Sequence, residues 1–183
     1  EIAKISVNYH RLPGVRVEAE LIRYYPYGES LVHAMGYVGR INEKELKRVE
    51  PTNYSATHYI GKLGIEKFYE DQLHGEVGFQ KVETNARGRV MRVLERSDPR
   101  PGSDTVLHLD LRLQQITEKL LAGRRASVVA IDPKTGGILT MVSTPAYDPN
   151  LFVTGISYKN YNALRESPDL PLFNRAIRGR YPP

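Results

Sequence analysis

The chain of 183 residues can form one domain or two small ones, and 40% hydrophobic residues are enough for a packed core. It has no run near the roughly 20 apolar residues that a membrane-spanning helix needs, and zero cysteines exclude disulfides and thiolate metal sites. Its 26 basic residues are spread among 21 acidic ones, so the net charge of +5 does not indicate a nucleic-acid-binding stripe.

The first fifty residues predict short strands that alternate with short helices. Apolar residues alternate with charged ones over residues 15–21, a period of two that is typical of a half-buried strand. Residues 30–35 predict one or two helical turns, and residues 37–41 a short strand. Asn42, followed three residues later by Glu45, has the pattern of a capping box and predicts a helix that ends near Val49.

The next segment predicts a loop and then a single helix. Residues 51–59 are polar and are expected to form a loop. Apolar residues then recur at helical spacing over residues 65–73, and Gly75 is expected to end that helix.

A hairpin and a domain boundary are predicted next. Residues 78–83 and 89–94 resemble strands, and the turn residues 85–88 lie between them. Residues 97–103 contain two prolines, a glycine and small polar side chains, so they predict a stiff, exposed connector. We place the domain boundary there, with residues 1–103 in one domain and residues 104–183 in the other.

The second half predicts a helix, a strand, a tight turn and a second strand. Asp110 is a suitable N-cap and Gly123 a suitable end for the helix. The apolar, β-branched runs 126–131 and 138–142 predict strands, which pair through the turn-forming residues 132–137. Another short helix is predicted over residues 158–165, ahead of a loop.

Several of these runs resemble class B penicillin-binding proteins, and the match favours their elongation type over the division type. The runs are LDLRLQQ, AIDPKTGGILTMVSTPAYDPNLFVTGIS and NRAIRGRYPP in the second half, and the glycine-bounded run 61–75 with YYPYG and HAMGYVGRIN in the first. The resemblance implies an α+β fold. An elongated pedestal (the dimerisation, or non-penicillin-binding, domain) is followed by the first helix and β-hairpin of a transpeptidase domain.

The resemblance also implies serine acyl transfer that cross-links peptidoglycan stem peptides, with β-lactams as inhibitors of the complete protein and no cofactor. In the family the nucleophile lies in Gly-Ser-x-x-Lys, directly after Tyr-Pro-Pro. We therefore expect it just after Pro183, with no catalytic residue in this chain, and we expect the fragment alone to be inactive. None of the nine serines has a lysine three residues later, the spacing that would place the two on one helix face.

Neither the Lys-Thr-Gly run nor the histidines indicate a functional site. Lys134-Thr135-Gly136 spells a motif of penicillin-recognising enzymes, but in the family that motif lies after the nucleophile, so we interpret it here as part of a turn. The five histidines are scattered without the spacing of metal ligands, and no metal site is predicted.

An alternative function is a non-catalytic interaction module. The pedestal of the elongation type resembles regions that dock the scaffold protein MreC and the polymerase RodA. The candidate partner-facing residues are Val15, Val17, Tyr24 and Tyr25, although the tyrosines also suit packing at the edge of a core. No nucleic-acid partner is expected. The expected location is the periplasmic face of the inner membrane, with the family's single-pass anchor missing from this chain.

Overall fold

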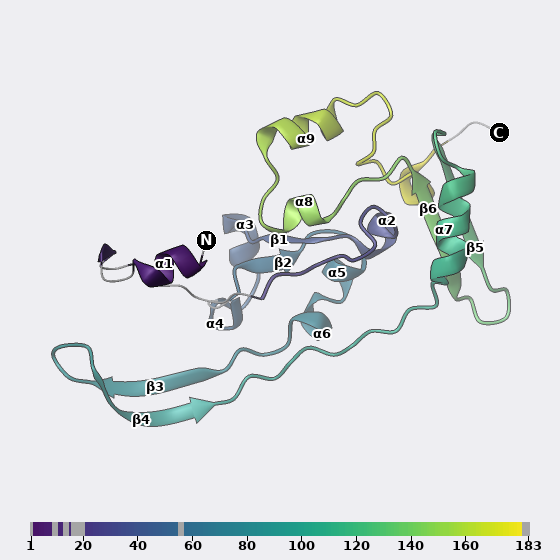
Figure 1. Cartoon of the computed structure of the whole chain (residues 1–183). Helices are drawn as coiled ribbons and strands as arrows, with labels where there is room; N and C mark the ends of the chain where they lie inside the picture. The colour runs from purple at the N-terminus through teal and green to yellow at the C-terminus, as the bar shows by residue number, and fades with distance from the viewer. Residues whose placement is uncertain (1, 9–10, 13–14, 16–20, 55–56, 181–183) are drawn as a thin grey trace.

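The computed structural model describes residues 2–8, 11–12, 15, 21–54 and 57–180, and it has the predicted α+β fold (Figure 1). Each sheet in the described part of the chain is an antiparallel pair of strands: β1 with β2, β3 with β4, and β5 with β6. The elements are α1 (Ile2–Val7), α2 (Val32–Met35), β1 (Val38–Arg40), α3 (Glu43–Leu46), α4 (Pro51–Tyr54), β2 (Tyr59–Gly61), α5 (Gly64–Phe68), α6 (Glu70–His74), β3 (Phe79–Thr84), β4 (Val90–Ser97), α7 (Leu111–Leu120), β5 (Ala126–Ile131), β6 (Ile138–Thr144), α8 (Asn150–Val153), α9 (Tyr158–Arg165) and α10 (Arg175–Arg178).

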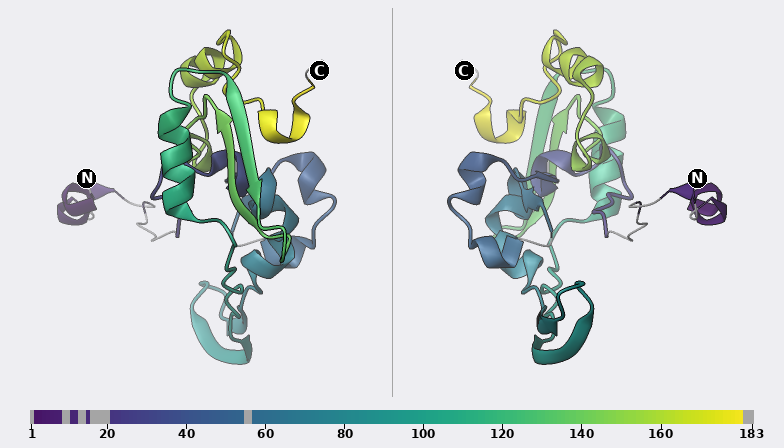
Figure 2. Two further views of the ribbon diagram at one scale, coloured as in Figure 1. Left: turned by 90° about the vertical axis from the view of Figure 1, so that its right-hand side faces the viewer. Right: turned by 90° about the vertical axis from the view of Figure 1, so that its left-hand side faces the viewer.

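Helix α7 packs on the β5–β6 hairpin, as Figure 2 shows. Asp110 caps the helix as predicted, accepting hydrogen bonds from the two backbone amides that follow Leu111. Gln114 is 1% exposed and donates to the Met141 carbonyl, while its own carbonyl accepts from Met141 N and from the Thr140 hydroxyl. Because every polar group of this buried amide has a partner, Gln114 fixes α7 on β6.

The turn between β5 and β6 forms as the sequence predicts. The Asp132 carboxylate accepts from Lys134 N and from the Thr135 hydroxyl, and Gly136 has a φ of 74°. Backbone hydrogen bonds between Asp132 and Gly137 and between Gly136 and Asp132 close the turn. Lys134-Thr135-Gly136 therefore has a local structural role, as predicted.

Close backbone contact joins α2 to α5. A Cβ atom added to Gly36 would lie 1.9 Å from the Leu63 carbonyl oxygen, and one added to Gly64 would lie 2.5 Å from the Ala34 carbonyl oxygen. Both glycines also have positive φ values. Any side chain would force these segments apart, and glycine is required at both positions.

Strands β3 and β4 form the predicted hairpin, which extends away from the rest of the molecule (Figure 1). Nearly every side chain in it is exposed. The pairing register shifts twice, between Lys81 and Val82 and again between Glu83 and Thr84. Such shifts are β-bulges, which increase the local twist of a strand pair.

Three local predictions in the first half are wrong in detail. Residues 51–54, expected to be a loop, form helix α4, which begins with proline at a position that needs no amide donor. The single helix expected over residues 65–73 is two helices, which meet at Tyr69 with φ −104° and ψ 22°. The capping box at Asn42 is confirmed, but α3 ends at Leu46 rather than near Val49. Most of the strand expected over residues 15–21 lies outside the described residues.

The break at Tyr69 lets the two short helices contact strand β2 separately. A Cβ atom on Gly61 would lie 2.1 Å from the Glu66 carbonyl oxygen of α5. The Gly61 amide donates to the Glu70 carboxylate of α6 at 2.7 Å. These contacts with another part of the chain outweigh the local helical pattern.

The connector expected over residues 97–103 is exposed, but its backbone is not free. Arg100 and Glu76 exchange both backbone hydrogen bonds at 2.9 Å, and Ser103 N donates to the Gln72 carbonyl. The segment therefore lies along the end of α6. The division of the chain into domains at residue 103 stays a prediction.

The buried hydrophobic cluster is built from both halves of the chain. Val32 of α2 packs with Tyr147 and with Phe152 of α8. The rings of Tyr147 and Phe152 meet edge to face with centroids 5.4 Å apart, and the ring centroid of Tyr37 lies 4.5 Å from that of Phe152. Partly buried residues complete the cluster: Tyr37, Ala146, Ile156, Leu164 and Leu172.

We predict that Phe152→Ala lowers the free energy of unfolding by about 3–5 kcal/mol, because it removes a buried ring that is 9% exposed and leaves a cavity. Phe68→Ala is the matched control, since Phe68 is 81% exposed and its loss should cost less than about 0.5 kcal/mol. Urea unfolding of both variants measures the difference. Equal losses of stability would contradict the placement of the core.

Candidate functional site

The two halves of the chain are joined by a pair of hydrogen bonds at the base of α8. Asn150 Oδ1 accepts from Tyr25 N at 2.9 Å, and Asn150 Nδ2 donates to the Tyr25 carbonyl at 3.0 Å. The Asp148 carboxylate orients this side chain, because it accepts from both the backbone and the side-chain nitrogen of Asn150. The side-chain amide of Asn150 thus satisfies both backbone hydrogen-bonding groups of Tyr25, as a neighbouring strand would.

Two further side-chain hydrogen bonds cross the same junction. The Ser30 hydroxyl donates to the Glu118 carboxylate of α7 at 2.7 Å. Asn174 Nδ2, at the start of α10, donates to the His33 carbonyl of α2 at 2.9 Å. Helix α2 and the nearby Ser30 therefore form hydrogen bonds with two separate segments of the second half, α7 and the start of α10.

Helix α10 is held by a buried arginine. Arg175 is 6% exposed, and its guanidinium donates to the backbone carbonyls of Asp169, Leu170 and Phe173. The Ser143 hydroxyl of β6 accepts from Arg175 N at 2.9 Å and donates to the Phe173 carbonyl at 3.3 Å. Because these groups lie away from water, the hydrogen bonds fix both ends of the loop that leads into α10.

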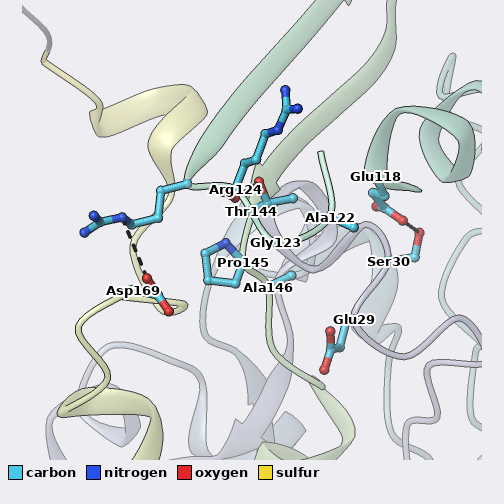
Figure 3. A pocket seen from close by; sticks show the side chains of 11 residues that line it. Glu29, Ser30, Glu118, Ala122, Gly123, Arg124, Thr144, Pro145, Ala146 and Asp169 are labelled. Atoms are coloured by element: carbon cyan, nitrogen blue, oxygen red, sulfur yellow. Dashed lines mark hydrogen bonds and ion pairs between the residues drawn. The ribbon is translucent and has the colours of Figure 1, made fainter. Parts of the chain in front are cut away.

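A pocket of about 310 Å³ lies where the two halves meet. Asp169 lies on one side of it, ion-paired with Arg125, and the Ser30–Glu118 pair lies on the other, with Pro145 between them (Figure 3). Glu29 also lines the pocket. Among the described residues, the lining contains no serine beside a lysine that could serve as nucleophile and base.

Ser30, Ser143 and the Lys-Thr-Gly run each have structural partners in the described residues. Ser143 is buried and engaged with α10, and Ser30 donates to Glu118. Lys134 to Gly136 lie in the β5–β6 turn. The described part of the chain also contains no group of three or more histidine, aspartate or glutamate side chains suited to a metal ion. Among the described helices, none is long and apolar enough to cross a bilayer.

The candidate partner-facing residues differ in their surroundings. Tyr24 is 72% exposed, and Val15 is also exposed. Val17 lies outside the described residues. Tyr25 is 8% exposed, so its assignment to a contact surface needs correction: its ring is buried and its hydroxyl accepts from Val38 N at 2.8 Å.

Tyr25 and Arg23 surround a buried carboxylate that the sequence analysis missed. Glu66 is buried in α5 and accepts from Arg23 Nε at 2.8 Å and from the Tyr25 hydroxyl at 3.1 Å. Burial disfavours the charged form of Arg23, but the Glu66 carboxylate outweighs it and raises the pKa of Arg23. Burial and the same carboxylate raise the pKa of Tyr25.

A second polar cluster connects α4 to α6. The Thr57 hydroxyl lies 2.9 Å from His74 Nε2, and the ring of His74 stacks on Tyr54 with centroids 4.2 Å apart. His74 Nδ1 lies 3.2 Å from the Gly75 carbonyl and 3.3 Å from Asn53 Nδ2. The imidazole therefore bridges backbone and side chains of two short helices.

The sequence did not predict that Asn150 and Asn174 join the two halves, and it indicates only the local part of their roles. Asp148 followed by Pro149 and Asn150 indicates a turn, and Asn174 ahead of Arg175 has the character of an N-cap. Their partners lie 125 and 141 residues away along the chain. A local pattern contains no information about such partners.

Comparison with known families gives two matches in succession. Residues 1–107 match the penicillin-binding protein dimerisation domain, and residues 126–183 match the penicillin-binding protein transpeptidase domain. Peptidoglycan D,D-transpeptidase MrdA of Escherichia coli K12 is 56% identical over the whole chain, which covers 30% of that protein. The same protein of Acinetobacter baumannii is 52% identical, and the chain covers 27% of it. The chain thus spans under a third of the length of these curated relatives.

Solved structures show the same fold. PBP2 of Pseudomonas aeruginosa, in complex with WCK 5153, is 54% identical with a TM-score of 0.78, over 92% of this chain and 33% of that one. PBP2 of Helicobacter pylori, in complex with MreC, is 33% identical with a TM-score of 0.83, over 94% of this chain and 32% of that one.

We predict that the junction is less stable in mild acid because of His33. Burial lowers the pKa of His33, and the Arg175 charge adds to this effect, while the Pro145 and Pro171 carbonyls act in the opposite direction. The ring meets Tyr147 edge to face at 5.6 Å, and His33 Nε2 has no hydrogen-bond partner among the described residues. The unfolded chain, in which histidine has a pKa of about 6.5, therefore takes up this proton at a higher pH than the folded chain.

The stability that neutral His33 contributes is present above a pH of about 6.5 and is lost as the pH falls toward the lower folded-state pKa. Unfolding free energies of the wild type and His33→Leu, measured from about pH 7.5 down to 5.5, test this. The wild type should lose stability more steeply. Parallel curves would refute the contribution of His33.

Proposed function

The chain belongs to the penicillin-binding proteins, and on this premise we propose that it forms the pedestal and the first catalytic-domain elements of a class B peptidoglycan D,D-transpeptidase of the elongation type. The observation that carries the proposal is the succession of the two family matches along one chain. The superposition on two PBP2 structures supports it. In this proposal residues 1–103 are the pedestal and residues 104–183 begin the catalytic domain.

The proposed reaction is acyl transfer between peptidoglycan stem peptides. A serine hydroxyl attacks the carbonyl carbon of the penultimate D-alanine, and terminal D-alanine leaves with the proton that the base received from the serine. An amine of a neighbouring strand then attacks the acyl-serine ester, forms the cross-link and releases the serine. Serine needs a nearby base for the first step, because its free hydroxyl is a weak nucleophile.

The chain's own residues would support this chemistry without performing it. None of the nine serines has the Ser-x-x-Lys spacing. We therefore place the nucleophile beyond Pro183, where the family carries it, and β-lactams would acylate that same residue. The role of the described residues is to fix α10, the last helix before that point, through Arg175 and Ser143.

Acylation by a fluorescent penicillin tests this function. We expect covalent labelling of the protein that continues beyond Pro183 through a Gly-Ser-x-x-Lys motif, and no labelling when that serine is replaced by alanine. The 183-residue chain should stay unlabelled under the same conditions. Labelling of the short chain would show that it contains a nucleophile, whereas failure to label the long protein would refute the transpeptidase assignment.

The substrate also implies a location. Peptidoglycan lies outside the cytoplasm, so the proposed enzyme acts at the periplasmic face of the inner membrane, held there by an anchor outside this chain. RodA is proposed as a partner by family resemblance.

A second candidate function is docking of MreC on the pedestal. The Helicobacter pylori PBP2 structure was solved in complex with MreC, and it superposes on 94% of this chain. Tyr24 offers an aromatic ring that is 72% exposed, and its neighbours Arg23 and Tyr25 both bind the buried Glu66 carboxylate, which holds the backbone of Tyr24 in place. Exposed aromatic rings on rigid backbone are frequent anchors of protein interfaces. Val15 is the other described candidate.

We predict that Tyr24→Ala weakens binding of the periplasmic part of MreC by about tenfold, the effect of losing one interface aromatic side chain. Tyr158→Ala is the matched control, because Tyr158 is 79% exposed but lies on α9 of the second half. Titration by calorimetry measures both. Absence of wild-type binding at micromolar concentration would exclude the docking function, and equal effects of the two substitutions would exclude Tyr24 as a contact.

A further inference from the structure

Asn174 makes hydrogen bonds in two directions. Its Oδ1 accepts from Ala176 N at 3.1 Å and from Ile177 N at 3.3 Å, and so caps the N-terminus of α10. Its Nδ2 donates to the His33 carbonyl in α2 at 2.9 Å. One planar amide therefore fixes the start of α10 and its distance from α2 at the same time.

The other hydrogen bonds of α10 itself lie within the second half of the described chain. Ser143 of β6 holds Arg175 N, and the Arg175 guanidinium binds carbonyls of its own preceding loop. Among the described residues, the hydrogen bond from Asn174 to His33 is the one that joins α10 to the first half. Helix α10 also packs on β5 and β6, so Asn174 adds a direct link from α10 to the first half to the contacts that run through this hairpin.

Helix α2 is itself tightly placed within the first half. Its C-terminal Gly36 lies against the backbone of Leu63, and Val32 is in the hydrophobic cluster. We expect a displacement of α2 to reach the residues in contact with it, because close packing leaves little room to absorb a shift. The hydrogen bond from Asn174 to the His33 carbonyl makes Asn174 one of these residues.

We propose that Asn174 is a positioning residue, which sets the place of α10, and so of the catalytic serine that follows it, relative to the pedestal. This inference rests on the proposed function, since it needs a nucleophile beyond Pro183. Only residues 179–183 separate the end of α10 from that point. Over so short a connection, a displacement of α10 by about 1 Å misaligns the serine and lowers the acylation rate.

The chain contains a natural control for the capping role. Asn42 caps α3 with the same geometry, since its Oδ1 accepts from Lys44 N and Glu45 N at 3.0 Å. It is on the surface, and the hydrogen bonds that its side chain makes among the described residues stay within α3. Replacing either asparagine by aspartate keeps the capping oxygen and removes the amide donor, but only at residue 174 does this break a bond to another helix.

The experiment compares Asn174→Asp with Asn42→Asp in the complete protein that carries the Ser-x-x-Lys motif. The readout is the second-order rate constant of acylation by fluorescent penicillin, normalised to the titrated reactive fraction. We expect a fall of about tenfold or more for Asn174→Asp, because an oxygen then faces the His33 carbonyl, and no change for Asn42→Asp. A purely structural role would lower the reactive fraction and the melting temperature, and would leave the normalised rate constant unchanged.

A pH series adds a readout that a structural role would not move. The carboxyl group that Asn174→Asp introduces can, once protonated, donate to the His33 carbonyl again, so the ratio of variant to wild-type rate constants should rise as the pH falls toward about 4. Asn174→Ser covers the case in which the aspartate variant does not fold, because serine keeps a cap and introduces no charge, and the same fall in rate is expected.

The outcomes separate the proposed function from the role of Asn174. If the wild type is not acylated, the proposed function fails. If the wild type is acylated and the folded Asn174 variants react at its rate, only the positioning role of Asn174 is overturned.

Discussion

The packing of Val32 against Tyr147 and Phe152 is the contact on which the rest of the structure depends. Val32 lies in the first half of the chain, and the two aromatic residues lie in the second. Helices α2 and α8 have four residues each, and helices of that length are not stable on their own in water. Burying this cluster gives the short helices and two-stranded sheets a common hydrophobic centre.

Side-chain amides, one of them the buried Gln114, set the geometry between neighbouring segments. Apolar packing is not directional, whereas the hydrogen bonds of Gln114, Asn150 and Asn174 each fix a distance and an orientation between two backbone segments. Gln114 joins α7 to β6, and Asn150 joins α8 to the backbone of Tyr25. Losing the Gln114 amide would leave the buried Thr140 hydroxyl without this partner, and an unsatisfied buried group costs about 1–3 kcal/mol. Asn174 in turn joins the start of α10 to the backbone of α2.

The sequence predicts well where the determining interactions are local. The cap at Asp110, the capping box at Asn42 and the turn that begins at Asp132 each depend on atoms within a few residues, and all three form. The break at Tyr69 was missed because Gly61, outside the helical window, decides it through contacts with α5 and α6. The same distinction applies to the candidate site. The sequence did not show that Tyr25 is buried or that Arg175 is surrounded by carbonyls, because both depend on segments brought together only by folding.

The two register shifts in the β3–β4 hairpin have a consequence for solubility. The hairpin projects from the molecule with exposed apolar side chains and, within the described part of the chain, two strand edges outside any larger sheet, a combination that favours aggregation by edge-to-edge pairing. The bulges twist those edges out of a flat plane. The ion pair between Glu83 and Arg92 also places charged side chains on the hairpin against which a second copy of the chain would have to pair. Both features oppose the extension of this hairpin into a continuous intermolecular sheet.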